Sequence, residues 1–192
     1  MPAKDEEDVD PATGLMVKEK AAIVESWKYV LPNQKVESIA FFEKLFTTHP
    51  QYIDYFPKFK GKQLAEMKEM GSFVLHAKSV FTALTAIVNN LDNADYLVKL
   101  LLKTGKDHKM RGVPKQAFRN LALVFMDFME ERLGSNFTPL AKSSWEKALA
   151  VVVDVCHKVL HTTNFTMLSL PSTPYHIPSA WWTRTLTTNR YN

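Results

Sequence analysis

The chain has 192 residues, 46% of them hydrophobic, and these values predict one globular domain with a sizeable core rather than two full domains. Its formal net charge of +4 comes from lysines and arginines scattered among acidic residues, which argues against a nucleic-acid-binding surface. The single cysteine, Cys156, excludes an intramolecular disulfide and favours a reducing compartment.

The N-terminal segment, residues 1–14, is charged and carries Pro2, Pro11 and Gly14, so we expect a disordered extension there. It lacks the apolar run of a signal peptide, and the chain contains no stretch approaching eighteen consecutive apolar residues. We therefore expect a cytoplasmic protein with no membrane and no nucleic acid among its partners.

Two helices are expected ahead of an aromatic corner. Apolar residues at helical spacing predict the first helix over residues 17–30 and the second over residues 35–48, with Phe42 on the buried face of the second. Pro50 ends the second helix or opens a short third one. Residues 52–60 concentrate large rings, including Phe56, which either pack on something flat or fill a loop over the core. A polar linker is expected over residues 60–68.

Residues 73–113 predict two helices that each direct one histidine toward the core. The apolar stripe of the first contains Phe73, His76, Val80, Leu84, Ile87 and Leu91, and that of the second Leu97, Leu101, Thr104 and His108. At about 1.5 Å per residue, the first helix rises roughly 22 Å beyond His76, and the second returns roughly 16 Å to His108. The two imidazoles are therefore expected at similar levels along the axes of the helix pair. Either each histidine has its own protein partner, or the two share a metal.

The last two helices are separated by a turn at Gly134. The first follows Gly112-Val113-Pro114 and buries Phe118 and Leu121, and the second starts at Thr138-Pro139 and carries Cys156, which we expect to pack in the core. Over residues 161–192 the apolar residues show no regular spacing. We expect a mostly disordered tail, although Trp181 and Trp182 could dock on the domain or on a partner.

Residues 15–160 therefore predict an all-α domain of six to eight helices, and this region resembles a globin. The residues that carry the resemblance are Trp27 in the first helix, Pro50 and Phe56 at the corner, His76 with Val80 at the distal position, His108 at the proximal position, and Val113-Pro114 below it. The resemblance implies a globin fold around haem b (iron protoporphyrin IX). A zinc site would require three or four protein ligands, and no third histidine lies near these two in the sequence.

The resemblance also implies roles for the site residues. His108 would bind the iron while a carbonyl holds its other ring nitrogen, and His76 would either hydrogen-bond the gas or bind the iron itself. The remaining expected contacts are Phe56 stacked on the porphyrin, Phe42 and Val80 on the distal side, Val113, Phe118 and Leu121 on the proximal side, and Lys58 and Arg111 near the propionates. The 32-residue spacing of the histidines is similar to that of neuroglobin-type chains, so we expect hexacoordinate, bis-histidyl iron.

Three functions are compatible with these residues. The first is reversible binding of dioxygen or another diatomic gas for storage, transport or sensing, by a monomer or weak homodimer. The second is a redox enzyme, such as a nitric oxide dioxygenase, nitrite reductase or peroxide scavenger, that depends on an external reductant. The third is a haem-free helical module that binds a partner, and the presence of both His76 and His108 beside Phe56 argues against it.

Overall fold

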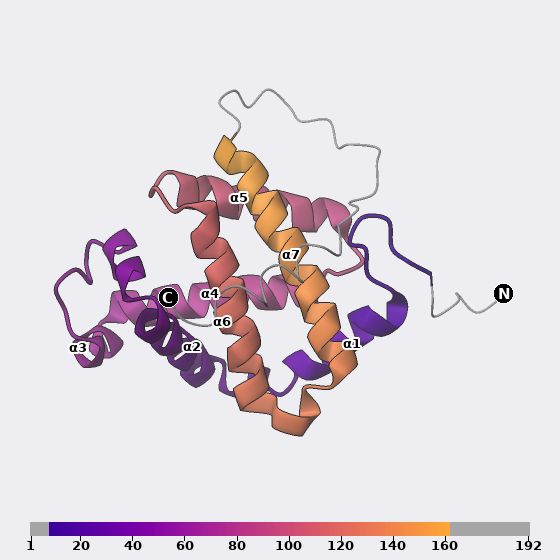
Figure 1. Ribbon diagram of the computed structural model, residues 1–192, viewed down its shortest axis with the longest axis horizontal. Helices are drawn as coiled ribbons and strands as arrows, with labels where there is room; N and C mark the ends of the chain where they lie inside the picture. The colour runs from indigo at the N-terminus through magenta and orange to yellow at the C-terminus, as the bar shows by residue number, and fades with distance from the viewer. Residues whose placement is uncertain (1–7, 162–192) are drawn as a thin grey trace.

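The computed structural model describes residues 8–161, and the rest of the chain, including the expected C-terminal tail, lies outside the described residues. Figure 1 shows helices packed at steep angles to one another, with α6 and α7 running across the direction of α4. The α-helices within the described range are α1 (Val17–Trp27), α2 (Gln34–Thr48), α3 (Leu64–Glu69), α4 (Gly71–Val88), α5 (Ala94–Lys109), α6 (Lys115–Leu133) and α7 (Pro139–His161). The short 3-10 helices are η1 (Leu31–Asn33), η2 (Pro50–Tyr55) and η3 (Gly134–Asn136). The expected all-α fold class is confirmed.

Helix boundaries follow the polar and conformational signals in the sequence. The Asn93 side chain accepts a hydrogen bond from the backbone N–H of Tyr96 at 3.1 Å and starts α5. The Thr138 hydroxyl accepts one from the N–H of Ala141 at 3.1 Å at the start of α7. Pro114 precedes α6, and Gly134 follows its last residue, so these two predicted boundaries are confirmed.

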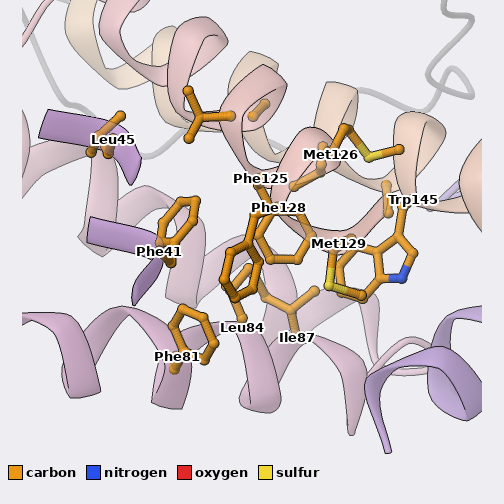
Figure 2. Packing of buried hydrophobic residues seen from close by; sticks show 14 of the residues in the cluster. Phe41, Leu45, Phe81, Leu84, Ile87, Phe125, Met126, Phe128, Met129 and Trp145 are labelled. Atoms are coloured by element: carbon orange, nitrogen blue, oxygen red, sulfur yellow. The ribbon is translucent and has the colours of Figure 1, made fainter. Parts of the chain in front are cut away.

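An aromatic cluster joins α2, α4 and α6 at the centre of the molecule. Phe41 lies with its ring centroid 5.8 Å from Phe81, 5.8 Å from Phe125 and 5.6 Å from Phe128. Figure 2 shows these rings meeting from three helices. The tilted and edge-on arrangements are those that aromatic quadrupoles favour. The ring contacts therefore favour particular orientations of the three helices in addition to burying apolar area.

Two tryptophans extend this core to α1 and α7, and each has a partner for its indole N–H. Trp27 donates to the Thr85 hydroxyl at 3.1 Å, and Trp145 donates to the Ser26 hydroxyl at 2.9 Å. The Ser26 hydroxyl in turn donates to the carbonyl of Ile23 at 2.9 Å. Because a buried polar atom without a partner is costly, these bonds fix how α1 meets α4 and α7.

The buried face of α4 differs from the predicted stripe. Its fully buried residues are Phe73, Ala77, Phe81, Leu84, Ile87 and Val88, whereas His76 and Val80 are only half-buried. Because α4 packs against α1, α2 and α3, its buried face is turned away from the His76 side of the predicted stripe, toward Ala77, Phe81 and Val88. This orientation leaves His76 at the border of the core.

Two segments that were expected to lack structure are ordered. In residues 8–14 the Asp10 carboxylate accepts from the N–H groups of Ala12 and Thr13 at 2.8 and 3.2 Å and pairs with Lys20 of α1. Lys20 also pairs at 2.7 Å with Asp92, which precedes α5, so this one lysine joins the N-terminal turn to the domain. In the expected linker, α3 forms because Met67 is fully buried.

By length and composition, α4 could cross a membrane, with a mean hydropathy of 1.4 over 18 residues. Its apolar residues are accounted for by the aromatic cluster described above, since Phe73, Ala77 and Phe81 pack in the protein core. The hydropathy of α4 is therefore that of a core helix.

The two faces of α4 can be tested by a pair of truncations. Phe81 is completely buried, and we expect Phe81→Ala to lower the free energy of unfolding by about 3–5 kcal/mol through the lost burial and the cavity. Leu75 is 68% exposed on the same helix, and Leu75→Ala should change it by less than about 0.5 kcal/mol. Urea denaturation measures both, and similar costs for the two variants would contradict the assigned orientation of α4.

Candidate functional site

His108 stands near the C-terminal end of α5 with one ring nitrogen already committed. Its Nδ1 lies 2.8 Å from the carbonyl oxygen of Thr104, one turn earlier. Because a carbonyl oxygen only accepts, Nδ1 carries the proton and Nε2 keeps a lone pair. The edge of the imidazole packs on Phe118 of α6, with ring centroids 5.1 Å apart. The structure thus presents His108 as an oriented nitrogen donor.

The chain turns sharply just after His108. The carbonyl of His108 accepts from the N–H groups of Arg111 at 3.0 Å and Val113 at 3.2 Å, and Gly112 has φ +70°. Only glycine adopts that conformation without strain, so Gly112 lets the chain leave α5 and enter α6 within a few residues. Val113 and Phe118 are thereby brought to the same side as the histidine.

His76 on α4 lies between the edges of two phenylalanine rings. Its centroid is 5.1 Å from Phe42 of α2 and 4.9 Å from Phe56, both in edge-on geometry. Phe56 is itself stacked on Phe59 at 5.2 Å, so the aromatic corner supports the distal histidine. Sequence analysis did not single out Phe59, although it lies in the aromatic run that was noted.

His76 and His108 act on one another although they come from different helices. Burial, together with the smaller effects of the charges of the nearby His108 and Arg111, lowers the pKa of His76 to about 4. The His76 imidazole is therefore neutral at pH 7. The electrostatic effect of His108 on His76 places the two side chains near one another. That the two imidazoles face each other, as expected from helix heights, stays a prediction.

The expected lining residues lie on α2, α4 and α6 or, for Phe56 and Val113, in the segments between helices. Phe42 is buried, while the other expected residues are only partly buried although they pack against the core: Phe56, Val80, Val113, Phe118 and Leu121. Val80 follows His76 by one turn of α4, and Leu121 follows Phe118 by about one turn of α6. Partly exposed apolar side chains gathered around two nitrogen donors are suited to contact an apolar ligand.

Two cations that were expected near haem propionates are both exposed. The Arg111 guanidinium donates to the carbonyl of Asp107 at the end of α5, and Lys58 lies in the turn after the aromatic corner. The effect of Arg111 on the pKa of His76 places its charge near the site. A role for either cation toward propionates stays a prediction.

The donor set can be compared with the metals it could serve. Within residues 8–161 no group of three or more His, Cys, Asp or Glu side chains is placed to hold a metal ion. Two imidazoles suit a metal that brings its own remaining ligands, as iron in a porphyrin does. The aromatic and aliphatic surroundings suit the flat apolar macrocycle. The residues present therefore fit haem.

The chain is similar in sequence to known proteins of one family. The family model described as Globin matches residues 39–156. A globin of Nerita albicilla is 32% identical over 148 residues, covering 77% of this chain and 94% of the relative, and a globin of Tritia mutabilis is 31% identical over 144 residues, covering 73% and 98%.

Two solved structures have a similar fold. A hexacoordinated haem protein from an anhydrobiotic tardigrade has a TM-score of 0.73 and 25% identity, with coverage of 80% of this chain and 99% of that one. Ferric myoglobin of Aplysia limacina has a TM-score of 0.70 and 26% identity, with coverage of 76% and 98%. Both align over most of the described residues.

The packing of Cys156 of α7 against α5, the helix that carries His108, yields a chemical prediction. Cys156 of α7 is fully buried against α5, and burial raises the pKa of its thiol to about 12. We expect iodoacetamide to alkylate the native protein at pH 8 at least about 100-fold more slowly than the urea-unfolded chain, because only the thiolate is nucleophilic. Mass spectrometry measures both rates, with Cys156→Ser as the blank, and comparable rates would contradict the buried thiol.

Proposed function

This chain belongs to the globin family, and we propose that it binds haem b and, through the haem iron, binds dioxygen reversibly. One observation carries the proposal: His108 has its Nδ1 held by the Thr104 carbonyl, and His76 of α4 is close enough for the charge of His108 to lower its pKa. Haem as the cofactor is further supported by the haem protein and the myoglobin among the structural neighbours.

When bound, haem supplies an iron centre that coordinates a diatomic gas reversibly. The protein's part on the proximal side is to present Nε2 of His108 in one tautomer and one orientation. The hydrogen bond to Thr104 fixes the tautomer and raises the basicity of Nε2, which strengthens its bond to a metal. Phe118 limits rotation of the ring from the other side.

On the distal side we propose that His76 is a second iron ligand, which an incoming gas must displace. The low pKa of His76 supports this role, because a protonated imidazole has no lone pair to offer. The similar fold of a hexacoordinated haem protein from a tardigrade also supports this role. Where the iron holds a gas instead of His76, the same imidazole would be able to donate a hydrogen bond to that gas.

The aromatic residues around His76 control water and space. Phe42 and Phe56 hold the edges of its ring, and Val80 lies one turn further along α4. These apolar side chains border the imidazole, and excluding water from such a site would strengthen the electrostatic interactions within it. We further propose a cytoplasmic protein that is a monomer or weak homodimer.

The proximal assignment is tested by His108→Ala. We expect the purified variant to hold less than about one tenth of the haem of the parent, since loss of a first ligand should exceed the 10- to 100-fold effects ascribed to outer-shell groups. The pyridine haemochrome assay gives the haem content and also identifies the b type. Lys106→Ala, an exposed position on the same helix, is the control. Unchanged haem content in His108→Ala would refute the assignment.

The distal assignment is tested by the visible spectrum of the ferrous, gas-free protein. We expect sharp, split bands for the parent and one broad band for His76→Leu, because the variant loses one axial ligand. The exposed Lys78→Ala on the same helix should keep the parent spectrum. A broad single band in the parent would show that His76 does not bind the iron.

Reversible gas binding is tested by repeated oxygenation of the reduced protein. Several cycles of binding and release, followed by the Soret band, are the expected result. Rapid oxidation in the first cycle, together with sustained consumption of nitric oxide when a reductant is supplied, would instead assign the redox function.

A further inference from the structure

Helices α5 and α7 meet backbone to backbone at Gly105 and Cys156. A Cβ atom added to Gly105 would lie 2.6 Å from the carbonyl oxygen of Cys156 and 3.0 Å from its Cα. Both are main-chain atoms, so no side-chain rotation could relieve the overlap. Gly105 lies inside α5, where its backbone is helical, and the glycine is therefore required by space rather than by an unusual φ.

A hydrogen bond fixes the same contact one turn earlier. The thiol of Cys156 donates to the carbonyl oxygen of Leu101 at 3.4 Å, and both residues are buried. A neutral thiol is a weak donor, and the raised pKa of Cys156 keeps it in that form. The missing side chain of Gly105 thus sets the distance between α5 and α7. The hydrogen bond from the Cys156 thiol to the Leu101 carbonyl holds α5 in place against α7.

His108 lies three residues after Gly105, about 4.5 Å further along the axis of the same helix. Thr104, whose carbonyl orients the imidazole, adjoins Gly105 directly. A displacement of α5 from α7 would therefore carry both His108 and its orienting carbonyl with it. Because α5 is a continuous helix over this range, the shift could not be absorbed between the two residues.

We propose that Gly105 is a positioning residue for His108: its missing side chain lets α5 rest on α7, and this contact determines where Nε2 of His108 meets the haem iron. The inference rests on the haem binding proposed above. It also accounts for a glycine inside α5, where alanine would ordinarily be the better helix former.

Gly71 provides a matched control for the same substitution. It lies in the first turn of α4, and a Cβ added there meets nothing within 4 Å. Gly71→Ala should leave the thermal midpoint unchanged or raise it slightly, because alanine favours the helix. Gly105→Ala should lower it, although both changes add one methyl group to a helix.

The experiment compares Gly105→Ala, Cys156→Ala and Gly71→Ala in a His76→Leu parent, so that His108 is the one assigned histidine ligand. Haem transfer to an excess of a haem-scavenging apoprotein gives the rate of haem loss, and resonance Raman of the ferrous, gas-free protein gives the iron–imidazole stretching band. For Gly105→Ala we expect the rate of haem loss to rise by about 10-fold or more, the size of effect seen when groups outside the ligand shell are altered. We also expect the iron–imidazole stretching band to be displaced. Cys156→Ala, which removes the thiol bond without crowding, should displace the band less, and Gly71→Ala should match the parent.

A lower thermal midpoint alone does not support the proposal. If Gly105→Ala and Cys156→Ala both keep the parent's haem-loss rate and stretching band, Gly105 serves packing only and the inference is overturned. Should Gly105→Ala fail to fold, Cys156→Ala decides by the band alone. A protein with wild-type His76 that binds no haem would overturn the proposed function itself, and that result is distinct from an unchanged variant in a haem-loaded parent.

Discussion

The hydrogen bond between Nδ1 of His108 and the Thr104 carbonyl is the interaction on which the site depends. It exists because α5 remains helical as far as Lys109, which places the carbonyl of residue 104 beneath the imidazole of residue 108. The turn at Gly112 then returns the chain at once toward α6. Without the bond the imidazole could rotate or change tautomer, and Nε2 would be a less directed donor.

A second constraint is that α4 supplies residues both to the hydrophobic core and to the candidate site. Phe81 and Ala77 belong to the aromatic cluster with α2 and α6, while His76 sits between the edges of Phe42 and Phe56. A helix that packs on several neighbours has few positions left for a polar residue. His76 occupies the border, where it is buried enough to stay neutral at pH 7 but is not enclosed by the core.

Much of the site could be predicted from sequence because it depends on local periodicity. The helix boundaries at Asn93, Pro114 and Gly134 are encoded by single residues. That helical rise brings the two histidines level stays a prediction. The contact of Gly105 with Cys156 could not be foreseen, since it joins residues 51 positions apart in sequence. A mid-helix glycine signals only that something approaches closely, not which helix does.

The ordered turn at residues 8–14 was missed for a similar reason. A charged segment is expected to be solvated unless its charges find fixed partners, and here Lys20 and the backbone N–H groups provide them for Asp10.

The apolar residues around the histidines are only partly buried by the chain itself. Covering Phe56 and Phe118 with a flat apolar ligand would add burial that the chain does not obtain by itself, so ligand binding and fold stability should be coupled through mass action. The residues that bind the ligand would thus also determine how strongly the ligand stabilises the fold.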